Sequence, residues 1–138
     1  MTPDRFLDTN ILLYSISLAP DEQRKRDIAI ELLDRDDIGL SAQVLSEFYF
    51  QATRPTRRDS LPPELAAGLV GTWRRFPIQA ISADIVTEAM RLHAQHGFSF
   101  WDSQILSAAM ALGCKYLVTE DMSHGREIEG IRIVDPFK

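Results

Sequence analysis

Short apolar runs alternate along the chain with longer segments in which apolar residues recur every three or four positions. The short runs predict β-strands, and the helical period between them predicts amphipathic helices, such as the one that holds Leu65, Leu69 and Trp73. The predicted strands cover residues 5–7, 38–40, 77–81, 116–119 and 131–134. Strands that alternate with helices are typical of a parallel sheet covered by helices on both faces, so we predict an α/β fold.

Residues that favour helix ends mark several of the boundaries. Pro20 opens a helix with an acidic first turn, and Ser41 is placed to cap the next helix. A long helix is expected over residues 102–112, with Gly113 as the first residue beyond it. No repeat, low-complexity tract or linker interrupts this pattern. Residues 1–138 are therefore predicted to form one domain.

The composition, 45% apolar and 25% charged residues, is that of a globular protein. No uninterrupted apolar stretch approaches the length that spans a bilayer, so we expect no membrane contact. The first residues also lack the basic region and apolar stretch of an export signal. The single cysteine, Cys114, cannot form an internal disulfide and is interpreted as a small buried hydrophobic residue. We expect a cytoplasmic protein.

The formal net charge of −5 argues against a protein that binds nucleic acid through a broad basic surface. It does not exclude a metal-dependent nuclease. Two bound divalent cations would cancel most of this charge and would reverse the sign of the electrostatic field inside their site. Part of the acidity can therefore belong to the site itself.

Two aspartates follow predicted strands at their carboxyl ends. Asp8 comes directly after residues 5–7, and Asp121 lies just beyond residues 116–119. In open parallel sheets, ligands bind beyond the carboxyl ends of the strands, so both carboxylates are expected at that edge. Taken alone, each is also a common cap or turn residue.

Asp102 and Glu47 lie on predicted helices. Asp102 continues the apolar stripe of Ile105 and Leu106, where an unpaired charge is costly. An N-cap role would account for Asp102, but not for the aromatic residues just before it, Phe98, Phe100 and Trp101. Glu47 has no basic residue one helical turn away, so it needs either a distant arginine or a cation.

Four such acids that converged at one edge would repel each other unless cations neutralised them. Carboxylate oxygens are hard ligands that select Mg²⁺ or Mn²⁺, and the sequence has no cluster of histidine and cysteine residues that would suggest zinc. We predict a site for one or two of these ions formed by four residues, Asp8, Glu47, Asp102 and Asp121.

These acids, in this order and with these neighbours, resemble the motifs of the PIN-domain family. The matching segments are FLDTN at residues 6–10, SAQVLSEF at 41–48, WDS at 101–103, TED at 119–121 and IRIVDPF at 131–137. The resemblance covers nearly the whole chain. It implies a single PIN-like domain with a central five-stranded parallel sheet and helices on both faces.

The resemblance also implies nuclease activity. The small size is similar to that of VapC-type toxins of toxin–antitoxin pairs, which implies an endoribonuclease, a homodimer and a small antitoxin partner. In the mechanism that we expect, water activated by metal cleaves RNA phosphodiester bonds. Asp8 and Asp102 are the expected direct ligands, and Asp121 and Glu47 complete or orient the set.

Further residues near these motifs are candidates for positioning. Asn10, Ser41 and Thr119 could hold the ligands or a water by hydrogen bonds, although caps and turns explain them equally well. Glu120 could supplement Asp121, because the family's usual aromatic residue after the last acid is replaced here by Met122 and its successors.

A small basic cluster follows the helix that holds Glu47. Arg54, Arg57 and Arg58 could bind RNA phosphates. In an acidic chain, such a run is more often a solvated loop.

Two other classes of protein fit the sequence less well. A phosphatase of the haloacid-dehalogenase type has a second aspartate two residues after the first, where this chain has Asn10. Its lysine would have to be Lys115, which precedes a strand instead of following one. A non-catalytic PIN-like module that binds RNA or protein would have no need of all four acids.

Overall fold

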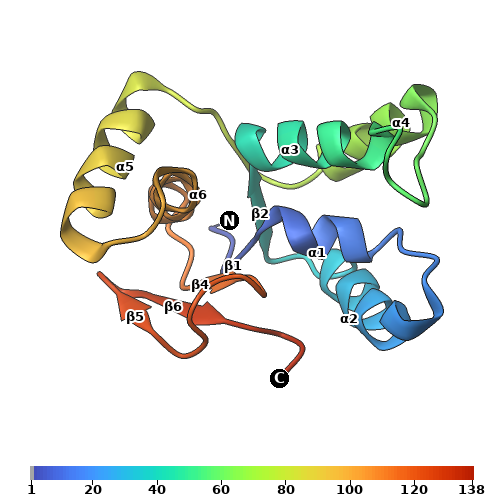
Figure 1. Ribbon diagram of the computed structural model, residues 1–138. Helices are drawn as coiled ribbons and strands as arrows, with labels where there is room; N and C mark the ends of the chain where they lie inside the picture. Colours follow the sequence, from blue (N-terminus) through green and yellow to red (C-terminus); the bar gives the residue numbers. More distant parts are fainter. Residues whose placement is uncertain (1) are drawn as a thin grey trace.

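The computed structural model describes residues 2–138, in which strands alternate with helices (Figure 1). The strands are β1 (Arg5–Leu7), β2 (Ile38–Ser41), β3 (Ile78–Gln79), β4 (Tyr116–Val118), β5 (Glu127–Ile128) and β6 (Ile131–Val134). The helices are α1 (Thr9–Tyr14), α2 (Gln23–Leu33), α3 (Ala42–Thr53), α4 (Pro63–Trp73), α5 (Ala83–His96) and α6 (Phe100–Ala111), and a short 3₁₀ helix, η1 (Pro20–Glu22), precedes α2.

The strands form one sheet in the order β3-β2-β1-β4-β6-β5. Neighbouring strands are parallel, except that β5 is antiparallel to β6. The predicted α/β fold is confirmed, but the predicted count of five strands omits β5. Glu129 and Gly130 join β5 to β6 with φ angles of 49° and 93°, a two-residue turn that suits a hairpin. Because β5 is so short, it has no apolar periodicity that the sequence could reveal.

Helices cover both sides of the central strands. In Figure 1, α5 and α6 lie on one side of these strands, and α1 to α4 lie on the other. Helix α6 contacts α5, β2, β3 and β4, and residues 103–109 are all buried. Because α6 has neighbours all round, its apolar residues are not confined to one stripe. The Ser107 hydroxyl donates a hydrogen bond of 2.9 Å to the Ile85 carbonyl oxygen, so this buried polar group is satisfied.

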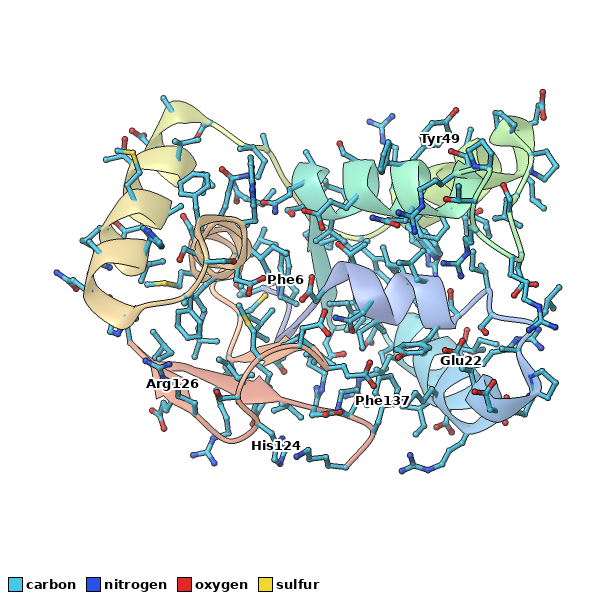
Figure 2. All side chains as sticks on the ribbon, viewed as in Figure 1. Phe6, Glu22, Tyr49, His124, Arg126 and Phe137 are labelled. Atoms are coloured by element: carbon cyan, nitrogen blue, oxygen red, sulfur yellow. The ribbon has the colours of Figure 1, made fainter. Side chains whose placement is uncertain are left out.

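The core lies around the central strands. Phe6 of β1, Leu117 of β4 and Ile133 of β6 are fully buried, and Phe6 lies near the centre of the molecule in Figure 2. Phe48 of α3 and Leu106 of α6 belong to the same core. Burial of each such side chain contributes about 1.5–3 kcal/mol to the stability of the fold.

The helix starts explain where two candidate residues point. The Ser41 hydroxyl accepts a hydrogen bond of 3.3 Å from the Val44 N–H, which confirms the predicted cap of α3. Helix α6 begins at Phe100, two residues before the predicted start. Its cap is Ser99, whose hydroxyl accepts a hydrogen bond of 3.1 Å from the Asp102 N–H. Asp102 therefore lies in the first turn, and its carboxylate does not serve as the cap.

Cys114 is buried, as predicted, and its burial raises the pKa of the thiol to about 12. Within residues 2–138, no helix has the length and apolar content that crossing a bilayer requires.

Candidate active site

Asp8 lies where β1 passes into α1, at the carboxyl edge of the sheet. Its backbone N–H still donates to the Val118 carbonyl of neighbouring β4, at 3.0 Å. One carboxylate oxygen accepts from the Thr9 N–H at 2.7 Å, and the other accepts from the Thr119 hydroxyl at 2.8 Å. Asp8 is only 5% exposed. The side chain is thus held at a fixed place by the ends of two adjacent strands.

Asn10 and Thr119 connect Asp8 to Asp121. The Asn10 side-chain amide donates to Asp121 at 2.9 Å and to the Thr119 hydroxyl at 3.2 Å. The same hydroxyl accepts a hydrogen bond of 3.1 Å from the Asp121 N–H. Because β1 and β4 are adjacent and parallel, residues that follow them meet at this edge.

Glu47 reaches the same edge from α3. One carboxylate oxygen accepts from the Thr9 hydroxyl at 2.8 Å, and the other accepts from the Gln43 amide at 2.9 Å. Gln43 in turn accepts a hydrogen bond of 2.7 Å from Gln104 of α6. Within residues 2–138, no basic side chain forms a salt bridge with Glu47, so a distant arginine does not explain it.

Three residues of this network, Thr9, Gln43 and Gln104, were not among the predicted site residues. The spacing of Gln43 and Glu47 could have revealed one of these contacts, because residues four positions apart lie on the same helix face. No sequence signal indicates the contacts of Thr9 with α3 or of Gln104 with Gln43, since both depend on how separate elements pack.

Asp102 completes the set of acids from the first turn of α6. Its partial burial raises the pKa of the carboxyl, the hydrogen bond with Ser99 opposes this, and the negative charges of Asp121 and Glu47 raise the pKa further. Burial raises the pKa of Asp8 to about 6; the hydrogen bonds from Thr119 and Thr9 lower it, and the charges of Asp102 and Asp121 add to the rise. The four carboxylates therefore affect one another electrostatically.

The donor chemistry fits a hard divalent cation. All four groups offer carboxylate oxygens, and no lysine, arginine or histidine within residues 2–138 forms an ion pair with any of them. As the side chains stand, however, no three Asp, Glu, His or Cys side chains in this part of the chain are close enough together to hold a metal ion. The carboxylates of Asp8, Glu47 and Asp121 instead accept hydrogen bonds from neutral groups.

Two of the other candidate residues have hydrogen-bond or ionic partners outside the four acids. Ser41 is fully buried at the start of α3, where it serves as a cap. Glu120 forms a salt bridge with Lys25 of α2 and accepts a hydrogen bond of 2.5 Å from the Tyr14 hydroxyl. Partial burial opposes the charge of Glu120, but these hydrogen bonds outweigh that effect and lower the pKa of its carboxyl. Glu120 therefore has a cationic partner, which the four acids lack.

A pocket of about 280 Å³ opens beside the acids. It is lined by Asn10, Leu13, Tyr14, Glu22, Arg57, Glu120 and Asp121. Of the three arginines in the basic cluster, only Arg57 lines this pocket; Arg54 and Arg58 are exposed. The Nε atom of Arg57 is buried and has no hydrogen-bond partner among residues 2–138. Arg57 thus differs from Arg54 and Arg58, because it alone of the three lines the pocket.

In a comparison with known families, the model of the PIN domain matches residues 5–126. No curated protein sequence matches the chain.

Several solved structures share the fold. A toxin–antitoxin complex from Klebsiella pneumoniae has a TM-score of 0.69 at 21% identity, over 96% of this chain and 98% of that one. DNA-bound VapBC from Salmonella typhimurium has a TM-score of 0.67 at 24% identity, over 97% and 98%. Mycobacterium tuberculosis VapC20, described as a Sarcin-Ricin loop cleaving toxin, has a TM-score of 0.64 at 18% identity, over 83% and 87%. At such low identities, the likeness concerns the fold.

Proposed function

The chain belongs to the PIN domain family, and we propose from this membership and from its acidic site that it is a metal-dependent endoribonuclease, the toxin of a toxin–antitoxin pair. One observation carries the proposal. Hydrogen bonds of Thr9, Asn10 and Thr119 join Asp8, Glu47 and Asp121 at the carboxyl edge of the sheet, and no basic side chain within residues 2–138 is paired to these three acids or to Asp102.

Asp8 and Asp102 would hold Mg²⁺ or Mn²⁺, as one or two ions, and Asp121 and Glu47 would complete the set. When bound, such an ion supplies Lewis acidity and lowers the pKa of water toward neutrality. The reaction is hydrolysis of an RNA phosphodiester bond that leaves a 5′-phosphate and a 3′-hydroxyl.

Neutral side chains of the protein hold the acids in position for this reaction. Asn10 and Thr119 orient Asp121, and the Thr119 hydroxyl also donates a hydrogen bond to one carboxylate oxygen of Asp8. Gln43 and Thr9 orient Glu47. Fixed hydrogen bonds of this kind reduce the reorganisation that the ligands need when a cation and a substrate phosphate arrive.

Arg57 is the residue that we assign to an RNA phosphate, because it lines the pocket beside Asn10 and Asp121. Arg54 and Arg58, exposed and outside that pocket, would contribute less.

Similarity to solved toxin–antitoxin complexes supports the biological part of the proposal. The Klebsiella pneumoniae structure is described as a toxin–antitoxin complex and the Salmonella typhimurium structure as DNA-bound VapBC, and this chain covers 98% of the matched chain in each. The Mycobacterium tuberculosis relative is described as a Sarcin-Ricin loop cleaving toxin. We propose that this protein likewise has a small antitoxin partner and forms a homodimer.

The test is an RNA cleavage assay with purified protein in Mg²⁺ or Mn²⁺, with sequencing of the fragment ends. We expect cleavage that a chelator abolishes and that Asp8→Asn and Asp102→Asn abolish without loss of the fold by circular dichroism. Equal cleavage by the wild type in chelator, or by either variant at saturating metal, would contradict the assignment. Binding of RNA without cleavage would instead favour a non-catalytic module.

A further inference from the structure

The side chain of Trp101 is exposed, and its backbone lies beside the acidic site. Trp101 is the second residue of α6 and immediately precedes Asp102, and its side chain is 63% exposed. The other tryptophan, Trp73, is 4% exposed and packs edge-to-face on Phe48 in the core. A tryptophan carries the largest apolar side-chain surface, so the exposure of Trp101 contrasts with the burial of Trp73.

Contacts on both sides hold Trp101 in position. Its ring packs edge-to-face against the ring of Phe100, with centroids 5.2 Å apart at 75°. Its backbone carbonyl accepts a hydrogen bond of 3.3 Å from the Gln43 amide, and the same amide donates to Glu47 at 2.9 Å. The backbone of Trp101 is thus linked to Glu47 through the side chain of Gln43, and to Asp102 by the peptide bond between them.

We propose that Trp101 is a stacking platform for a base of single-stranded RNA close to the bond that is cut. This inference rests on the proposed nuclease function. Every base has a flat π face, so stacking on an aromatic side chain adds affinity without any positive charge. That mode suits a chain of net charge −5, which has little basic surface with which to hold a polyanion.

The positions of the two contacts relative to the acids support this assignment. Asp121 and Asn10 form part of the wall of the pocket that Arg57 lines, while the backbone carbonyl of Trp101 and the carboxylate of Glu47 accept hydrogen bonds from the same Gln43 amide. A strand that crossed the acids would therefore have a phosphate contact at one end and a base platform at the other.

An apolar groove that could take up a second protein lies elsewhere among the described residues, between α3 and α4. That groove is lined by Leu45, Ser46, Tyr49, Ala67 and Val70 and has a volume of about 420 Å³.

The experiment uses Trp101 as its own probe. In the full-length chain that carries Asp8→Asn, to prevent cleavage, and Trp73→Phe, Trp101 is the one remaining tryptophan. We titrate this protein with a short single-stranded oligoribonucleotide in Mg²⁺ and record the tryptophan fluorescence. Stacking predicts strong quenching by the intact oligonucleotide and much weaker quenching by an oligonucleotide that lacks bases.

Affinity is measured separately, by anisotropy of a dye-labelled oligoribonucleotide with Asp8→Asn protein. We expect Trp101→Ala to weaken binding on the order of 5- to 100-fold and Trp101→Tyr to retain most of the affinity. The matched control is Tyr49→Ala. Tyr49 is 41% exposed, lies in the groove between α3 and α4 (Figure 2), and should not affect RNA affinity.

Unchanged affinity in Trp101→Ala, or equal quenching with and without bases, would overturn the inference. A change in the oligomeric state of Trp101→Ala with unchanged RNA affinity would assign the indole to a protein contact and would also overturn it. Cleavage by the wild-type protein distinguishes a failure of the proposed nuclease function from a failure of the proposed stacking platform. If the wild type cuts RNA while Trp101→Ala binds it normally, the nuclease function stands and only the platform fails.

Discussion

Asn10 and Asp121, separated by 111 positions in the chain, are joined by a hydrogen bond of 2.9 Å from the side-chain amide of Asn10 to the carboxylate of Asp121. The amide also reaches the Thr119 hydroxyl, which donates to Asp8. One neutral side chain therefore connects the ends of β1 and β4.

Asn10→Ala removes the donor that orients Asp121. We expect cleavage of RNA to fall about 10- to 100-fold, with a higher Mg²⁺ concentration for half-maximal activity, because groups that orient ligands typically contribute this much. The measurement is kcat/KM as a function of Mg²⁺. A variant that melts like the wild type and keeps both its kcat/KM and its metal dependence would show that the hydrogen bond is incidental.

The stability of the metal-free protein should depend on the ionisation of Asp8. The folded-state pKa of this carboxyl is about 6, compared with 3.8 for an ordinary aspartate. The unfolded chain then releases its proton at a lower pH than the folded one, so Asp8 makes folding less favourable as the pH rises from about 4 through 6.

Asp8→Asn cannot ionise and should lack this dependence. The free energy of unfolding of Asp8→Asn relative to the wild type should increase by about 1 kcal/mol between pH 5 and pH 7 in chelator. Urea unfolding at the two pH values measures the difference. A relative stability that is the same at both would mean that the pKa of Asp8 is not raised.

Divalent cations should stabilise the folded wild-type protein, because they bind the four carboxylates only when folding brings these together. At 100 times the dissociation constant, the gain is about 2.7 kcal/mol. Thermal unfolding with increasing Mg²⁺ or Mn²⁺ measures it, and Asp102→Asn should show a much smaller rise in Tm. An identical rise in both proteins would indicate that the ions bind elsewhere.

Arg57→Ala should weaken RNA binding more than Arg54→Ala or Arg58→Ala does. Arg57 alone of the three lines the pocket next to Asp121, so it is the one placed to contact a phosphate. We expect the slope of log affinity against log salt concentration to decrease by about 1 for Arg57→Ala. Equal effects of all three substitutions would assign the cluster to non-specific attraction.

Glu120→Gln tests whether the acid next to Asp121 takes part in metal binding. Glu120 is already paired with Lys25 and hydrogen-bonded to Tyr14, so we expect its substitution to leave the metal dependence of cleavage nearly unchanged. Asp121→Asn is the matched comparison and should shift that dependence strongly. A shift of similar size in Glu120→Gln would place Glu120 among the ligands.

The sequence alone determined the order of the elements and where the acids stand within them. Apolar period and cap residues are local signals, so β1, β4 and the cap at Ser41 could be predicted. The rule that ligands bind beyond the carboxyl ends of parallel strands then directed attention to Asp8 and Asp121. The short strand β5 was not predicted, because a strand of two residues has no recognisable apolar period.

Tertiary structure decided which polar groups face each other. The adjacency of β1 and β4 brings Asn10 to Asp121, and the packing of α3 against α1 brings Glu47 to Thr9. The salt bridge between Glu120 and Lys25 could not be predicted from the sequence either. The physical reason is that a side chain's partner depends on the relative placement of whole elements, which is set by burial of the shared core and not by neighbouring residues in the chain.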